Sequence, residues 1–347
     1  GNIFRVAGTT ERSLRLFGQI AQLAGVTTAT DLVNDLSDEN AQVLQKVTAE
    51  ADFPVRLVPA YIGLDGTVSR DAGAARVASR VATNTDKLHF GLVKIVTDGS
   101  IQDFTARVRW PGYYNGHENG IWIQPPAELK ATIAHFHAAG FQLHIHTNGD
   151  EATELALDGI EAALAAHPRA DHRHTLQHCQ MADAAQFRRM ASLGICANLF
   201  ANHIYYWGDA HHALTMGPDR AERMDACGTA LAHGVPLAIH SDAPITPLGP
   251  MFTAWCAVNR LTSSGRVLGA SERISVADAL RAITLGAAYT LGLDDRVGSV
   301  EVGKFADFCV LDEDPLAAQP AALKDLRIAG TVLGGRALAL PGSSFST

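Results

Sequence analysis

Cysteine is scarce in this sequence, and positive charge does not dominate it. The five cysteines are an odd number, are widely spaced and include no Cys-x-x-Cys pair. This pattern excludes a disulfide framework and a thiolate zinc site, and it predicts a protein of the reducing cytoplasm. The 28 Lys and Arg residues are outnumbered by 36 Asp and Glu residues, which gives a formal net charge of −8. Such a surface repels nucleic acid, and we expect no nucleic-acid partner.

The sequence also lacks long hydrophobic runs and has little charge. No stretch approaches the roughly 18 uninterrupted apolar residues of a membrane-spanning helix, so we expect no membrane partner. Only 18% of the 347 residues are charged and 47% are hydrophobic, whereas an average soluble protein carries roughly 25% charge. Much of the chain must therefore be interior, and its length suits one large α/β barrel with an appendage or about two domains.

Histidine is the residue type that the sequence concentrates. All but two of the 15 histidines lie between His135 and His240. Histidine is the commonest protein metal ligand and the usual proton-transfer group near neutral pH. This third of the chain is therefore where we expect chemistry.

Helical and strand patterns alternate along most of the chain. We expect helices at residues 11–24, 37–51, 72–82, 127–139, 151–166, 182–193 and 220–232. A short apolar or β-branched run follows each of them, at residues 26–31, 54–63, 92–100, 141–150, 172–180, 195–203 and 236–244. Strict alternation indicates a parallel sheet with right-handed crossovers. Seven such units in about 250 residues favour a TIM-like (β/α)8 barrel with seven of its eight strands visible, and a doubly wound sheet is the alternative.

The pattern changes after residue 242. We expect helices at 251–261 and 276–291, followed by β-hairpins or edge strands at 297–312 and 328–338. These features predict a barrel domain at residues 1–292 and a small β unit at residues 293–347. The segment 110–126 is rich in Gly, Asn and Tyr and resembles an active-site loop.

Polar side chains occupy the ends of the expected strands. They include Lys94, His146, His178 and Asp242, and side chains at the carboxyl ends of barrel strands form the active site. Each could instead be a core or capping group, but their joint placement favours a site. Imidazole and carboxylate ligands suit Zn²⁺, with Mn or Fe as alternatives, and an open metal site lowers the pKa of bound water to about 7. We therefore expect one or two divalent metal ions and hydrolysis of a small-molecule substrate.

Lys94 needs a separate explanation, because an ammonium group among metal ligands would repel the ions. Burial in an apolar strand disfavours its charge and frees the amine. A neutral amine can add carbon dioxide, and the resulting carbamate is an anionic ligand that can bridge two metals. The alternative is a buried lysine that pairs with Asp98.

Further polar and aromatic residues are candidates for a substrate pocket. His203, Tyr205 and Trp207 lie in an expected loop over the barrel mouth, where packing of the loop is the alternative role. The remaining candidates are Asp98, which could instead cap a turn, and His240, which could instead be a core histidine.

Six segments resemble the amidohydrolase superfamily, specifically the amidohydrolase-3 branch that contains N-substituted formamide deformylases. The segments are GLVKIVTDGS, HTNGDEATELALDGIEAAL, HTLQHCQMAD, NHIYYWGD, LAIHSDAPITPLGP and VGSVEVGKFADFCVLDEDP. The resemblance implies a metal-dependent hydrolase of amide or formamide C–N bonds, with a barrel and a composite β-sandwich. It also implies that Lys94 is the carboxylated lysine, that His146 and His178 are metal ligands, and that Asp242 binds metal and exchanges protons with the attacking water.

The family's first barrel strand, which ends in His-x-His, has no counterpart in the sequence. The pair His144 and His146 has this spacing but fits the fifth-strand pattern better. We expect that the chain is part of a longer protein. The alternatives are that a partner chain or second copy completes the barrel, or that the chain is a non-catalytic barrel fragment with a binding or assembly role. Missing strands would leave unpaired edges, which predicts a tendency to associate.

Overall fold

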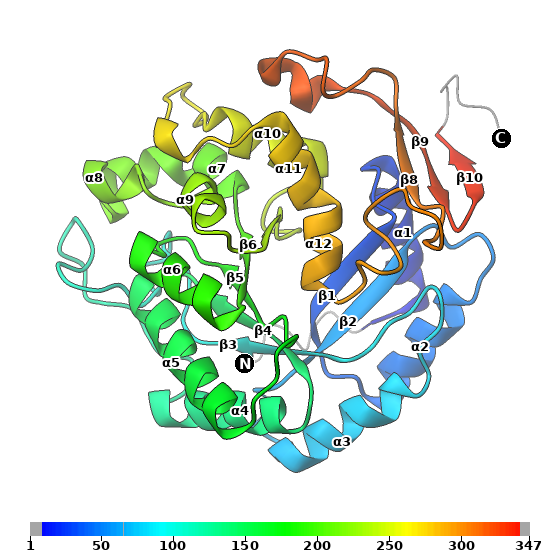
Figure 1. Cartoon of the computed structure of the whole chain (residues 1–347), viewed down its shortest axis with the longest axis horizontal. Helices are drawn as coiled ribbons and strands as arrows, with labels where there is room; N and C mark the ends of the chain where they lie inside the picture. Colours follow the sequence, from blue (N-terminus) through cyan, green and yellow to red (C-terminus); the bar gives the residue numbers. More distant parts are fainter. Residues whose placement is uncertain (1–8, 65, 341–347) are drawn as a thin grey trace.

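A curved, entirely parallel sheet of seven strands forms the centre of the molecule (Figure 1). The computed structural model describes residues 9–64 and 66–340. The strands follow one another in chain order across the sheet, and they are β1 (Thr28–Asn34), β2 (Arg56–Ile62), β3 (Leu92–Val96), β4 (Gln142–Thr147), β5 (Thr175–His178), β6 (Cys196–Leu199) and β7 (Leu237–Ile239). All seven expected strands are confirmed. This sheet, with helices between its strands, confirms the TIM-like barrel fold with seven visible strands.

Helices connect the strands and lie on the outside of the curved sheet (Figure 1). The first six are α1 (Glu11–Leu23), α2 (Asp38–Thr48), α3 (Arg70–Val81), α4 (Pro126–Ala138), α5 (Asp150–Ala166) and α6 (Ala184–Leu193). Each matches an expected helix, and side chains of Thr10, Ser37, Ser69 and Asp183 cap the N-termini of α1, α2, α3 and α6. Among the described residues, no helix combines the length and apolar character needed to cross a bilayer.

The first strand of the sheet, β1, is more exposed than the strands that follow it. Six of the seven residues of β2 are buried, which is typical of a parallel strand covered on both faces. In β1, by contrast, Thr30, Asp31 and Val33 are exposed. Within residues 9–64 and 66–340, β1 pairs only with β2 and β7 pairs only with β6. The outer edge of β1 thus has no strand partner in the described residues, whereas Gly286 lies against the Leu237 carbonyl of β7.

The expected helix at 220–232 is wrong as one element. The structure has α8 (Pro218–Ala221) and α9 (Cys227–Ala232), separated by a turn. In that turn the buried guanidinium of Arg260 donates to the carbonyls of Met224 and Asp225, each at 2.8 Å. Asp225 has a positive φ of 47°. These carbonyls are turned toward Arg260, so the helix cannot run through them.

The expected helix at 276–291 is also divided. After α10 (Pro250–Asn259), the chain forms α11 (Val276–Ile283) and α12 (Leu285–Thr290), with a break at Thr284. Gly286 lies so close to β7 that an added Cβ would be 2.1 Å from the carbonyl oxygen of Leu237. The break therefore lets α12 pack against the amino ends of the strands.

The last strands form a small antiparallel sheet in the order β10-β9-β8. These are β8 (Phe308–Leu311), β9 (Ile328–Leu333) and β10 (Arg336–Ala339). Arg56 of β2 forms a buried ion pair with Asp307 at 3.1 Å, and its guanidinium also lies over the ring of Phe305. The small sheet is thus tied to the same end of the large sheet as α1 and β2 (Figure 1).

Candidate metal centre

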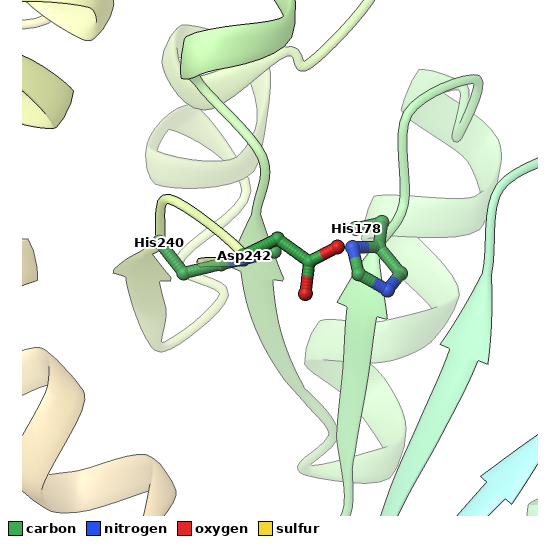
Figure 2. A group of neighbouring side chains, drawn as sticks. All are labelled: His178, His240 and Asp242. Carbon is green, nitrogen blue, oxygen red and sulfur yellow. The ribbon is translucent and has the colours of Figure 1, made fainter. Parts of the chain in front are cut away.

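Three side chains converge at the carboxyl ends of β5 and β7. His178, His240 and Asp242 each offer one ligand atom, and these atoms lie within 4.8 Å of one another. Figure 2 shows the carboxylate of Asp242 pointing toward the imidazole of His178. The rings of His178 and His240 are 4.9 Å apart at 61°. His178 and Asp242 are residues that the sequence assigned to metal binding, whereas it placed His240 in the substrate pocket.

Two nitrogens in this group have no partner in the protein. Nδ1 of His178 and Nε2 of His240 are buried, and neither makes a hydrogen bond within the described residues. A buried polar atom without a partner is costly, and most such atoms in proteins are satisfied. Two imidazole nitrogens and a carboxylate form a donor set that zinc and related divalent cations accept. The residues therefore fit such an ion.

Burial keeps both imidazoles in the neutral form that ligates metals. It lowers the pKa of His240 to about 3 and the pKa of His178 well below its usual value, and neighbouring cationic groups lower both further. Burial raises the pKa of Asp242, and the nearby Lys94 opposes that shift. Both imidazoles are therefore neutral near pH 7, so no bound proton has to leave before a metal ion binds.

Lys94 lies inside the barrel on β3. Its side chain is buried, and no hydrogen-bond partner of its amine is found in the described part of the chain. Burial lowers its pKa to about 8, while Asp242 and Cys179 act in the opposite direction. The alternative pairing of Lys94 with Asp98 is therefore wrong, because Asp98 bonds elsewhere.

Asp98 joins the loop after β3 to the start of α5. Its carboxylate accepts the backbone N–H groups of Arg107, Asn148 and Gly149 at 2.9 to 3.0 Å. A side chain on Gly149 would clash with the Arg107 carbonyl, at 1.7 Å from an added Cβ. Burial raises the pKa of Asp98 to about 7 against the effect of these bonds. Asp98 thus supports the loop, and its predicted contact with substrate stays a prediction.

His146 lies beside the three-residue group, and its Nε2 already has neighbours in the protein. Its Nε2 is 3.2 Å from the carbonyl of Gly99 and 3.2 Å from the amide nitrogen of Asn148. Its ring is 4.6 Å from that of His178. His146 is at the predicted rim, but it does not belong to the group whose ligand atoms meet.

The predicted loop at 203–212 is helical. The chain forms α7 (Asn202–Ala210) and a π-helical turn, η2 (His211–Thr215), and Nδ1 of His203 lies 3.2 Å from Nε2 of His211. The loop prediction for His203, Tyr205 and Trp207 is therefore wrong, and this hydrogen bond joins the two helical segments. It joins residues eight positions apart, so the sequence pattern does not show it.

Aromatic contacts through Phe200 link His203 of α7 to His240 of the three-residue group. Phe200 stacks on His240 at 4.9 Å and packs against His203 at 4.5 Å. Trp207 packs on the other side of His203, whereas Tyr205 packs against Phe252. Phe200 was not among the residues that the sequence singled out. The feature that could have indicated its place near the site is its position directly after the end of β6.

A chain of buried side chains crosses the barrel interior beneath the site. The Asn198 amide donates to Gln177 at 2.8 Å, and the Gln177 amide donates to Nδ1 of His144 at 2.7 Å. Nε2 of His144 in turn donates to the Thr290 carbonyl of α12 at 2.9 Å. A carbonyl can only accept, so it fixes the His144 tautomer and the direction of every bond in the chain. Gln177 also escaped the sequence prediction, although it is a polar residue within an apolar strand.

Replacing Gln177 by leucine should destabilise the protein by about 1–3 kcal/mol, because it leaves the buried Nδ1 of His144 and the partly buried amide of Asn198 without a partner. The measurement is the free energy of unfolding from urea titration. Gln45→Leu is the matched control, since Gln45 makes only an exposed hydrogen bond to Thr83, and it should change stability by less than about 0.5 kcal/mol. Equal effects of the two changes would contradict the role of the interior chain.

Similarity to known proteins agrees with this geometry. The model of the amidohydrolase family matches residues 8–339. The amidohydrolase YtcJ of Bacillus subtilis is 31% identical over 256 residues, which are 72% of this chain and 47% of YtcJ. The N-substituted formamide deformylase of Arthrobacter pascens is 32% identical over 198 residues, which are 56% of this chain and 36% of that enzyme.

A solved structure shares the fold. A metal-dependent hydrolase from Pyrococcus horikoshii superposes with a TM-score of 0.71 at 21% identity, over 89% of this chain and 60% of that one. The chain spans less than half the length of the two curated relatives named above. The family match covers nearly all of the described residues, and the chain therefore belongs to the amidohydrolase family, in its amidohydrolase-3 branch.

Proposed function

We propose that the protein is a metal-dependent hydrolase that cleaves the C–N bond of a small amide, formamide or related substrate. The observation that carries this proposal is the convergence of His178, His240 and Asp242, with two buried nitrogens that lack any protein partner. The site lies at the carboxyl ends of the strands, where barrel enzymes carry their chemistry.

A divalent cation, which we propose to be zinc, supplies a Lewis acid for the scissile carbonyl and acidifies water near neutral pH. Asp242 takes a proton from the attacking water and delivers it to the leaving nitrogen as the C–N bond breaks. The products are a carboxylic acid and an amine. Burial lowers the pKa of Lys94 to about 8, which increases the fraction of neutral amine and supports a carbamate at this position when carbon dioxide is present.

The substrate class follows from the walls of the site. The partly exposed Trp207 offers aromatic surface, and it packs on the buried Phe200 that stacks on His240. Such surface suits an organic substituent on the amide nitrogen. The deformylase relative acts on N-substituted formamides, as its name states, and this supports formamides as the first compounds to assay.

No strand of residues 9–64 and 66–340 pairs with the outer edge of β1, and this supports completion of the barrel by an additional strand. We propose that a segment of a longer protein fills this position, since the matched relatives are more than twice as long as the aligned regions. A second copy of the chain is the alternative occupant. Activity of the 347-residue chain is therefore expected to rise when that strand is supplied.

The deciding experiment measures metal content and hydrolysis together. Protein purified from zinc-supplemented medium should carry about one ion per chain by mass spectrometry, and it should release amine from N-substituted formamides. A strong chelator should abolish release, and added zinc should restore it. A chain that neither carries nor acquires Zn, Mn or Fe would support the alternative of a non-catalytic barrel fragment.

An apolar stripe on α1 predicts self-association of the isolated chain. Leu16, Ile20 and Leu23 lie on one face of the helix and are 55%, 45% and 60% exposed. Changing all three to glutamine should shift the sedimentation profile toward monomer. Gln19→Ala, which alters an exposed polar position of the same helix, should leave the profile unchanged. An unaltered distribution in the triple variant would mean that other surfaces drive association.

A further inference from the structure

We infer that His203 is a substrate-binding residue, which donates a hydrogen bond from Nε2 to an uncharged oxygen atom in the substituent of the substrate. The inference rests on the proposed function and adds a requirement to it, namely that the preferred amide carries a second oxygen apart from its scissile carbonyl. The sequence placed His203 in a substrate pocket but gave it no role there.

The turn after β6 delivers His203 to the rim that carries the three-residue group. β6 ends at Leu199, and the His203 N–H donates to the Phe200 carbonyl at 3.0 Å where α7 begins. The Phe200 ring packs on His203 at 4.5 Å and on His240 at 4.9 Å. Within residues 9–64 and 66–340, the two imidazoles make no ring contact with each other. The atom that His203 reaches is therefore not an atom held at the three-residue group, and the two positions suit separate parts of one substrate.

A chain of hydrogen bonds fixes which nitrogen of His203 carries the proton. Nδ1 of His203 lies 3.2 Å from Nε2 of His211, and Nδ1 of His211 lies 2.8 Å from Oγ1 of Thr215. All three residues are buried, and the Thr215 hydroxyl makes no other hydrogen bond in the described part of the chain. Its proton therefore goes to Nδ1 of His211, because in any other direction it would be buried and unpaired. His211 then donates from Nε2 to Nδ1 of His203, which leaves the proton of His203 on Nε2.

Nε2 of His203 is the open end of this chain. It makes no hydrogen bond within the described residues, and unlike Nε2 of His240 it is not a fully buried nitrogen without a partner. A small molecule can therefore reach it. Burial, with His211 and His240 nearby, lowers the pKa of His203 well below its usual value, so the ring is neutral and offers one N–H donor. A single donor with a fixed direction selects an acceptor atom on the ligand.

Histidines near the amino ends of β4 and β5 form a chain that is closed at both ends. Nε2 of His137 donates to the His167 carbonyl at 2.7 Å, so its Nδ1 accepts from Nε2 of His174 at 2.8 Å. Nδ1 of His174 accepts the Leu143 N–H at 3.0 Å. Backbone groups thus satisfy both ends of that chain, as a structural role requires. The chain that ends at His203 has no such closure, which favours a ligand there.

The surroundings of His203 indicate the class of oxygen. Trp207, which is partly exposed, packs on the His203 ring at 4.5 Å, and Phe200 also lies against that ring. No Lys, Arg, Asp or Glu is among the groups that shift the pKa of His203. A neutral N–H donor between aromatic rings suits an ether, hydroxyl or carbonyl oxygen on a short carbon chain. A carboxylate would lack a cation to balance its charge against these apolar walls.

The first test reads the tautomer and the contact without turnover. Nitrogen-15 NMR of histidine-labelled protein distinguishes a proton on Nε2 from one on Nδ1, and the signal of His203 is identified by its loss in His203→Phe. We expect the Nε2–H form in chelator-treated wild-type protein. The signal should shift when N-methoxyethylformamide is added, and it should shift much less with N-butylformamide, in which a CH₂ group replaces the ether oxygen.

The second test compares kcat/KM for the same two compounds in metal-loaded protein. Wild type should prefer the ether by about 3- to 10-fold, which corresponds to one neutral hydrogen bond. His203→Phe should bring this ratio close to one, and His203→Gln, which retains an N–H donor, should keep part of the preference. His212→Phe is the matched control, because the partly exposed His212 bonds to Arg266 at 3.4 Å, and it should leave the ratio unchanged.

The outcomes separate this inference from the proposed function. An Nδ1–H form of His203, equal NMR shifts with both compounds, or an unchanged ratio in folded His203→Phe protein each overturns the inference. Tighter binding of N-formyl-β-alanine than of the ether overturns the assignment of an uncharged oxygen. Protein that shows the expected tautomer and shift but releases no amine overturns only the proposed hydrolysis. Circular dichroism establishes folding, and His203→Gln and the wild-type tautomer decide the matter should His203→Phe fail to fold.

Discussion

Replacing Asp242 by asparagine is expected to reduce turnover by about 10² to 10⁴-fold, the range that general acid–base catalysis contributes. Asparagine has nearly the same shape and keeps an oxygen toward the metal, but it cannot accept and return a proton. Asp242 also supplies the carboxylate of the three-residue group that contains His178 and His240. Metal content should therefore fall far less than turnover. Amine release from N-substituted formamides and metal analysis of the same preparation measure the two quantities.

Asp219→Asn is the matched control, because it makes the same chemical change at an exposed position of α8. It should leave turnover unchanged. A fully active Asp242→Asn protein would remove Asp242 from proton transfer and leave it a ligand at most. An inactive protein that has lost all metal would instead show that the carboxylate charge is needed to hold the ion.

The parallel sheet could be predicted from the sequence because its signals are local. The apolar run of β2 and the capping residues Ser37 and Ser69 each act within a few positions, and the structure confirms these elements. The breaks at Thr284 and around Asp225 depend on distant partners, namely the Leu237 carbonyl and Arg260. A tertiary contact of this kind overrides helix propensity, and no periodicity shows it.

The sequence predicted where the candidate site lies, but it did not predict the contacts that each side chain makes there. Strand ends placed His178 and Asp242 at one rim, and the structure brings them together. The contacts of the two histidines could not be predicted. Nε2 of His146 meets Gly99 and Asn148, whereas Nε2 of His240 is buried and has no partner in the described residues. Sequence spacing carries no information about those contacts. The same holds for Asp98, whose three backbone donors come from two separate loops.

Replacing Asp98 by alanine is expected to cost at least about 3 kcal/mol of stability. The change leaves three buried N–H groups, those of Arg107, Asn148 and Gly149, without an acceptor, and each unpaired donor costs about 1–3 kcal/mol. Urea titration measures the loss, and hydrogen exchange should show the added opening at residues 98–107 and 147–150 first, because these are the segments that the carboxylate joins.

Two matched changes determine whether the loss comes from these bonds. Asp98→Asn keeps one oxygen, so it should retain part of the bonding and lie between wild type and alanine. Asp103→Ala removes a carboxylate from the same loop, but that group accepts only an exposed bond from Ser100 at 2.6 Å, and its cost should stay below about 0.5 kcal/mol. Equal losses of stability in Asp98→Ala and Asp103→Ala would contradict the role of these three bonds.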